Sequence, residues 1–121
     1  DILIGAASFP RTATGCADLA EASRRLLATG PRLVVTTLGP EGCFCYGQGE
    51  SFHSPGFRVP VVDTTGAGDA FHGAFIYGLL QNWPLRQTAR FANAVAALNC
   101  RTLGGRRGLP TLAEVQAFLQ H

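Results

Sequence analysis

The sequence contains no methionine, a single tryptophan and few charged residues, which make up 15% of its 121 positions. It has no uninterrupted apolar run of about 18 residues, which argues against a membrane-spanning helix. No charged segment followed by an apolar core stands at the start, so no export signal is visible. The formal net charge of +2 is too small to indicate binding to nucleic acid. We therefore expect neither a membrane nor a nucleic acid as a partner.

Cysteine is present, but in no pattern typical of a metal site. The cysteines include no C-x-x-C pair, and no histidine accompanies them at the spacing of a zinc site. We expect free thiols in a reducing cytoplasm and no bound zinc. The four residues are Cys16, Cys43, Cys45 and Cys100.

The beginning of the chain indicates a piece of a longer protein. Residues 1–4 read Asp-Ile-Leu-Ile, which is typical of a strand already in progress. A hydrophobic fraction of 46% indicates a large interior. It also suggests that part of the apolar surface is covered by a partner or by a further segment of the protein. By length the chain is one domain. We expect it to be the C-terminal part of a larger protein.

Apolar runs and helical periodicities alternate along the chain, which predicts an α/β domain. The alternation favours a parallel sheet covered by helices, and the turn at 47–50 favours an antiparallel hairpin at its edge. The stretch through Pro10 and Gly15 is predicted to be a loop. The predicted strands are 2–4, 32–37, 43–46, 51–53 and 57–62, and the predicted helices are 18–29, 70–81, 84–100 and a last one that starts at 111.

Two features predict how the later helices begin and pack. Thr111 and Glu114 have the spacing of a capping box, which marks the start of the last helix. Small residues in the helix at 70–81 suit close packing against a neighbour; they are Gly73, Ala74 and Gly78. The last helix is predicted to turn Leu112, Val115, Phe118 and Leu119 inward.

A turn of small residues at 63–69 (Asp-Thr-Thr-Gly-Ala-Gly-Asp) joins an apolar run to a predicted helix. The start of a helix presents free N–H groups and the positive end of a dipole, which together bind anions. Asp69 in this turn could accept a proton from a hydroxyl, so the turn suggests phosphoryl transfer. Taken alone the pattern is weak, because it also suits a plain helix start with Asp69 favourable against the dipole.

Two common nucleotide-binding patterns do not fit the sequence. The phosphate-loop spacing G-x-x-x-x-G-K-[ST] is absent. The run from Gly66 to Phe71 mimics part of a dinucleotide fingerprint, but no acidic residue ends a strand about 20 residues later. A Rossmann cofactor site is therefore disfavoured.

Four motifs in order along the chain resemble those of the PfkB (ribokinase-like) family of carbohydrate kinases. The turn at 63–69, followed by Gly73-Ala74, is similar to the second signature of that family. The other three are Thr-Thr-Leu-Gly-Pro-Glu-Gly at 36–42, Phe-Ala-Asn-Ala-Val-Ala-Ala at 91–97, and Gly-Gly-Arg-Arg-Gly-Leu-Pro at 104–110. The resemblance implies a ribokinase-like, Rossmann-type sandwich of which this chain is the C-terminal, ATP-binding part. The sugar-binding residues and the lid would then lie in a segment outside it.

The resemblance implies roles for eight residues around the nucleotide. Asp69 corresponds to the catalytic base of the family, and Gly66, Ala67 and Gly68 to its anion hole. The positions that correspond to nucleotide-binding residues are Thr37, Gly39, Gly42 and Asn93. For Asn93 a locally satisfied position on a helix face is the alternative.

The resemblance also implies two kinds of cation. A monovalent cation site, for K⁺, corresponds to Asp63 and Thr65 with carbonyl groups of the loop from Gly104 to Gly108. The family motif N-x-x-E, which organises Mg²⁺ and its water, is missing, since residues 5–9 read Gly-Ala-Ala-Ser-Phe. We therefore expect Mg²⁺ to be held by ATP phosphates and water, and assign it no protein ligand.

The function that the resemblance implies is ATP-dependent transfer of the γ-phosphate to a hydroxyl group of a sugar or sugar derivative. The alternatives are a nucleoside or vitamin-precursor kinase of the same fold and a non-catalytic nucleotide-binding fragment. A flavodoxin-like regulatory domain, whose glycine turn binds any anion, is the third. The expected partners are a sugar-type small molecule and, in a homodimer, a second copy of the chain. The chain alone is expected to be inactive.

Overall fold

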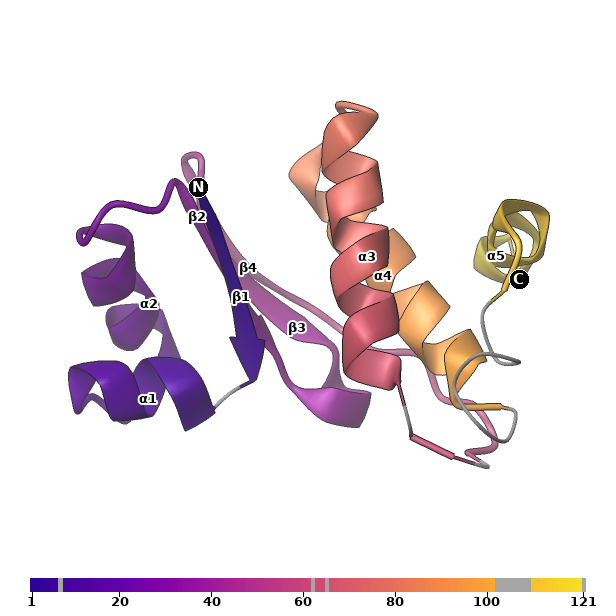
Figure 1. The fold of residues 1–121 in the computed structure, drawn as a ribbon, viewed down its shortest axis with the longest axis horizontal. Helices are drawn as coiled ribbons and strands as arrows, with labels where there is room; N and C mark the ends of the chain where they lie inside the picture. Colours follow the sequence, from indigo (N-terminus) through magenta and orange to yellow (C-terminus); the bar gives the residue numbers. More distant parts are fainter. Residues whose placement is uncertain (7, 62, 65, 102–109, 121) are drawn as a thin grey trace. The chain divides into compact units, whose positions relative to one another are not determined.

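The structure is a computed structural model that describes residues 1–6, 8–61, 63–64, 66–101 and 110–120. It consists of two compact units, Asp1–Ser54 and Pro55–His121, each with its own packing (Figure 1). The first unit contains the described strands, and the described part of the second contains three helices.

The first unit is built on a four-stranded sheet. Its strands are β1 (Ile2–Ala6), β2 (Leu33–Thr37), β3 (Cys43–Gly47) and β4 (Glu50–Ser54), and they lie in the order β1-β2-β3-β4. β1 and β2 are parallel, whereas β2–β3 and β3–β4 are antiparallel. The prediction of a parallel pair with an antiparallel edge hairpin is confirmed.

Two helices lie on one side of this sheet, α1 (Ser8–Thr14) and α2 (Leu19–Leu27) (Figure 1). The α2 helix starts as its sequence predicts, because the side chain of Asp18 accepts a hydrogen bond from the Glu21 amide. The α1 helix contradicts the predicted loop. Pro10 is the third residue of α1, where a backbone N–H has no partner within the helix, so proline costs nothing there.

The β3–β4 hairpin has a two-residue turn, Gln48-Gly49. Both residues have positive φ, 54° and 79°, which makes the turn type I′. The twist of this turn matches that of the strands, and it fixes the register in which Phe44 lies opposite His53. The turn therefore determines which side chains of β4 lie beside the start of β3.

In the second unit, α3 (Ala67–Leu80) packs along α4 (Leu85–Asn99) (Figure 1). The contact depends on Gly78, because a Cβ added there would lie 2.8 Å from Cγ2 and 2.9 Å from Oγ1 of Thr88. Gly78 thus serves close packing as predicted, whereas a Cβ added at Gly73 would meet no atom within 4 Å. None of the helices in the described ranges is long and apolar enough to cross a membrane.

This contact gives a first prediction. Gly78→Ala should lower the free energy of unfolding by about 1–2 kcal/mol, since the clash with the stiff, fully buried Thr88 outweighs the higher helix propensity of alanine. Thr88→Ala removes both clashing atoms, including a hydroxyl that has no hydrogen-bond partner among the described residues. The double variant should therefore recover most of the loss in urea unfolding. Additive losses from the two changes would contradict this packing.

The segment before α3 is not a strand, contrary to the prediction for residues 57–62. Residues 57–61 have no regular structure, and residue 62 lies outside the described residues. Pro60 has no N–H to give to a ladder, and the Phe57 ring packs against Phe118 instead, with centroids 5.0 Å apart. The Arg90 guanidinium lies 5.1 Å from the centroid of the same ring.

The last helix, α5 (Leu112–Leu119), starts with the predicted capping box. The Thr111 hydroxyl accepts from the Glu114 amide, and the Glu114 carboxylate accepts from the Thr111 amide, both at 3.1 Å. The hydrogen bonds from Thr111 lower the pKa of the Glu114 carboxyl. Val115 is buried as predicted, but Leu112 is not, since 42% of it is exposed. The helix is short, and only one of its faces is covered.

Candidate active site

The start of α3 carries the residues of the predicted anion hole. Gly66 precedes the helix with φ 78°, a left-handed conformation that glycine adopts without strain, and Asp69 lies in the first turn. Side chains cap the first turns of α2 and α5. Gly66 has no side chain to do so, and the first-turn amides are left to other acceptors.

The backbone amides of this turn differ in whether they already have a hydrogen-bond acceptor. The Ala67 amide donates to the Thr64 carbonyl at 3.1 Å, a contact that the motif did not reveal. The Gly68 and Asp69 amides donate to no other residue in the described part of the chain. A Cβ added at Gly68 would meet no atom of the described residues within 4 Å, so these residues leave room for a ligand beside its backbone. The turn can offer amides to an anion there, although Ala67 already has an acceptor.

The Asp69 side chain is exposed and borders a groove of about 440 Å³ within the second unit. A carboxylate at one position of a mostly apolar groove is an acceptor for a hydroxyl proton, and the groove gives a small molecule a surface to lie on. The lining includes Asp69, Gly73, Tyr77, Phe91, Val95 and Val115.

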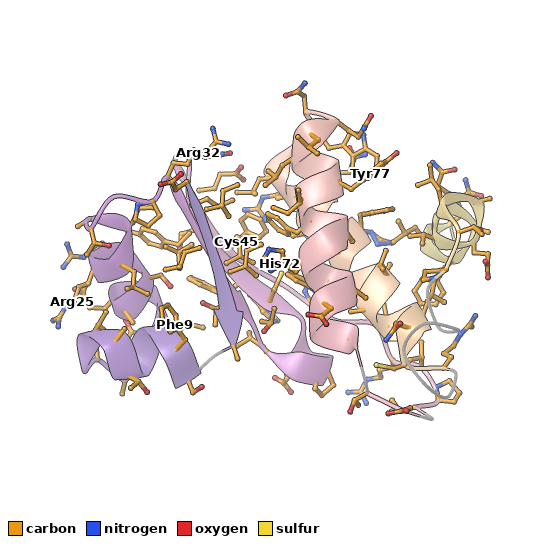
Figure 2. The ribbon with its side chains drawn as sticks, viewed as in Figure 1. Phe9, Arg25, Arg32, Cys45, His72 and Tyr77 are labelled. Atoms are coloured by element: carbon orange, nitrogen blue, oxygen red, sulfur yellow. The ribbon has the colours of Figure 1, made fainter. Side chains whose placement is uncertain are left out.

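His72 is close to Asp69 in sequence but does not share this groove. Its side chain is exposed and leaves α3 on a different side from Tyr77, which lines the groove (Figure 2). From its spacing, His72 could be mistaken for a relay partner of Asp69, but a surface position is the better interpretation, and its side chain is exposed.

The predicted nucleotide loop lies in the first unit. Thr37 ends β2, and its hydroxyl donates to the Gly5 carbonyl at 3.4 Å. A one-turn 3₁₀ helix, η1 (Gly39–Glu41), follows. Gly39 and Gly42 have φ 61° and 102°, conformations in which a side chain would be strained. A Cβ added at Gly39 would meet no protein atom within 4 Å, so its backbone can be approached.

Asn93 lies on α4 in the second unit. Only 5% of it is exposed, and its Nδ2 atom donates to the Pro55 carbonyl at 3.4 Å. Asn93 therefore has a hydrogen-bond partner within the protein, which is the alternative that we considered for this position. Asn93 can still border a ligand, but its amide nitrogen already has a protein partner.

Of the predicted cation ligands, only Asp63 lies in the described residues; Thr65, Gly104 and Gly108 lie outside them. Asp63 is half-buried, and its amide donates to the Cys100 carbonyl at the end of α4, at 3.2 Å. Burial and the negative charge of Asp63 raise the pKa of the Cys100 thiol. A carboxylate beside the negative end of a helix dipole is an environment that suits a cation.

The cysteines and acidic residues of the described ranges do not cluster. All four cysteines are free thiols. Within the ranges that the structure describes, no three histidine, cysteine, aspartate or glutamate side chains gather as metal ligands would.

Comparison with known proteins identifies the family. The model of the pfkB family carbohydrate kinases matches residues 2–112, which is nearly the whole chain. The chain belongs to this family. The match includes the glycine turn with Asp69, the loop at Gly39–Glu41 and the helix that carries Asn93.

Curated members of the family are similar over most of this chain. Ribokinase from Haemophilus influenzae is 38% identical over 92 residues, which are 76% of the chain and 30% of that protein. The 5-dehydro-2-deoxygluconokinase from Shouchella clausii is 34% identical over 101 residues, which are 83% of the chain and 31% of that protein. The chain thus spans about a third of the length of these relatives.

The fold is ribokinase-like. The structure of a putative ribokinase II from E. coli in complex with ATP and Mg²⁺ matches 99% of the chain with a TM-score of 0.92 and 29% identity. The matched part is 39% of that protein. The predicted fold class, an incomplete ribokinase-like sandwich, is confirmed.

Proposed function

We propose that the protein containing this chain transfers the γ-phosphate of ATP to a hydroxyl group of a sugar or sugar derivative. The observation that carries the proposal is the exposed Asp69 carboxylate in the first turn of α3, bordering the groove and one residue from the open backbone of Gly68. Membership of a family of carbohydrate kinases supports it.

In the proposed reaction, Asp69 accepts the proton of the acceptor hydroxyl. The oxygen of that hydroxyl forms a bond to the γ-phosphorus as the bond to the bridging oxygen breaks and ADP leaves. The transition state is loose, so Asp69 contributes more by aiming the oxygen than by early deprotonation. The Gly66, Ala67 and Gly68 amides at the positive end of α3 stabilise the charge on the transferred group. The Ala67 amide does so either by a bifurcated hydrogen bond to the Thr64 carbonyl and the phosphate, or by replacing the first of these bonds with the second.

The loop from Thr37 to Gly42 is proposed to lie along the nucleotide, and Asn93 to border its base. The two positive-φ glycines and the open space at Gly39 support this, because phosphate and ribose can reach the backbone. Mg²⁺ bound to the ATP phosphates neutralises their charge. Mg²⁺ commonly keeps several waters and would enter with its nucleotide, so no protein ligand is assigned to it.

The acceptor is proposed to be a sugar, and a substrate panel tests this. Two relatives are named for ribose and for 5-dehydro-2-deoxygluconate, so both belong in the panel beside a nucleoside and a vitamin precursor. ADP release by the intact protein should require a sugar-type acceptor. Turnover of the nucleoside alone would favour the alternative within the same fold.

We further propose that the 121-residue chain binds ATP but has no turnover by itself, since it spans about a third of the relatives' length. Sugar phosphorylation by the isolated chain would contradict this. Absence of ATP affinity in both the chain and the intact protein would overturn the proposed function and favour a regulatory anion-binding domain.

A monovalent cation is proposed to bind at Asp63 beside the end of α4. The half-buried carboxylate and the negative helix end fit K⁺, a hard cation that prefers oxygen ligands. Replacing Na⁺ by K⁺ at constant ionic strength should stimulate turnover several-fold, and Asp63→Asn should remove the stimulation. Equal rates in both salts would contradict the site.

A further inference from the structure

The exposed His53 side chain on β4 contacts the loop that precedes β3. Its Nε2 atom lies 2.7 Å from the carbonyl oxygen of Glu41, the last residue of η1. The hairpin register brings them together, because His53 lies opposite Phe44, three residues after Glu41. The sequence assigned no role to His53, and the contact joins residues twelve apart.

The chemistry of the two atoms fixes the direction of this hydrogen bond. A carbonyl oxygen only accepts, so the Nε2 atom of His53 must carry the proton. Both the neutral ring with Nε2 protonated and the charged ring provide that N–H. The hydrogen bond from His53 to Glu41 therefore does not need the ring to be charged.

The loop is otherwise closed mainly on itself. The Leu38 amide donates to the Gly42 carbonyl at 2.8 Å, and the Gly42 amide donates to the Gly39 carbonyl at 3.1 Å. The two glycines at its ends can rotate more freely than other residues. The Leu38–Gly42 bond continues the pairing of β2 with β3, so it fixes the base of the loop on the sheet. The bond from His53 adds a second tie farther along the loop, between Glu41 and β4.

We propose that His53 is a positioning residue for nucleotide binding, which acts through Glu41 by holding the Gly39–Gly42 loop in its binding orientation. The proposal rests on the proposed function in one respect, that this loop binds ATP. His53 itself need not touch the nucleotide. A tie of this kind reduces the ordering that the loop must undergo when ATP binds, so it should affect affinity more than the chemical step.

Two substitutions and a control separate this role from a general effect on β4. His53→Phe keeps a ring and a high strand propensity but has no N–H. His53→Gln keeps an N–H donor at a similar reach. Ser51→Ala changes another exposed residue of the same strand, opposite Tyr46. Each is made in the intact protein, and the Kd for ATP with Mg²⁺, kcat and the urea midpoint are measured.

His53→Phe should raise the Kd for ATP about fivefold, the effect of one hydrogen bond, with kcat and the urea midpoint nearly unchanged. His53→Gln and Ser51→Ala should stay within about twofold of the parent protein. An unchanged Kd in His53→Phe would overturn the proposal. So would a Kd in His53→Gln as high as that of His53→Phe.

Amide hydrogen exchange keeps the test independent of the proposed function. Because the tie steadies the loop, the Leu38 and Gly42 amides should exchange several-fold faster in His53→Phe than in His53→Gln. Equal exchange in the two variants would show that His53 does not hold the loop. A parent protein without affinity for ATP would overturn the proposed function and the nucleotide role, whatever the exchange shows.

Discussion

Asp69→Asn should lower the turnover of the intact protein at least about 10²-fold while leaving its Kd for ATP almost unchanged. Asparagine has nearly the same shape but cannot accept the hydroxyl proton, and its amide can orient the acceptor only as a neutral group. The base is used in the transition state and not in binding the nucleotide, so the loss should appear in kcat. Steady-state kinetics and calorimetric titration measure the two quantities.

His72→Gln is the matched control for this variant. His72 is exposed on the same helix but does not line the groove, so its replacement should leave turnover within about twofold. Near-normal turnover in Asp69→Asn would remove Asp69 from the role of base. A rise in the Kd for ATP as large as the fall in kcat would indicate instead that Asp69 supports the nucleotide site.

Gly47→Ala should lower the free energy of unfolding by about 3 kcal/mol or more. Gly47 is buried at the end of β3 with φ 141°, and an added Cβ would lie 2.5 Å from the Arg32 carbonyl oxygen and 3.0 Å from the Leu33 Cα. Both neighbours are backbone atoms that cannot rotate away. The urea midpoint and the slope of the transition measure the loss.

Gly49→Ala in the same hairpin separates strain from overlap. Gly49 also has positive φ, 79°, but a Cβ added there meets no atom within 4 Å. Its replacement should cost about 1 kcal/mol, the penalty of the left-handed conformation alone. Equal losses at Gly47 and Gly49 would show that the close approach of β2 does not constrain Gly47.

Features that depend on local chemistry could be predicted from the sequence. The Thr111–Glu114 capping box, the hairpin and the glycine start of α3 each depend on residues within four positions. Gly78 was correctly predicted to serve close packing, although its contact with Thr88 depends on a second helix and not on the local sequence. Gly73 was predicted by the same rule, but its place on the helix turns it to open space.

The errors occurred where the outcome depended on a partner or on an exact position. Pro10 suggested a loop, although proline in the first turn of a helix is tolerated, so α1 was missed. The apolar run at 57–62 has the composition of a strand, but Phe57 packs against Phe118 and no ladder forms at 57–61. Helical periodicity also predicted that Leu112 is buried, but it is exposed at the start of the short α5.

The candidate site could be predicted because its motif is contiguous, whereas the contacts that tune it could not. Asp69 and the residues of its turn are adjacent in sequence, but α3 starts at Ala67, three residues before the predicted helix at 70–81, so Asp69 lies inside its first turn. The bond from Ala67 to Thr64 and that from His53 to Glu41 depend on backbone geometry and strand register. No motif signals either of them.

Cytoplasmic location and the homodimer stay predictions.

The most direct test is a crystal structure of the intact protein with ADP, Mg²⁺, an aluminium fluoride mimic of the transferred phosphate and the acceptor sugar. The account predicts an Asp69 carboxylate oxygen about 2.6–3.2 Å from the acceptor hydroxyl. It also predicts a hydrogen bond from the Gly68 amide to a fluoride. A nucleotide bound elsewhere, with Asp69 in solvent and the amides of its turn bonded only to protein atoms, would contradict it.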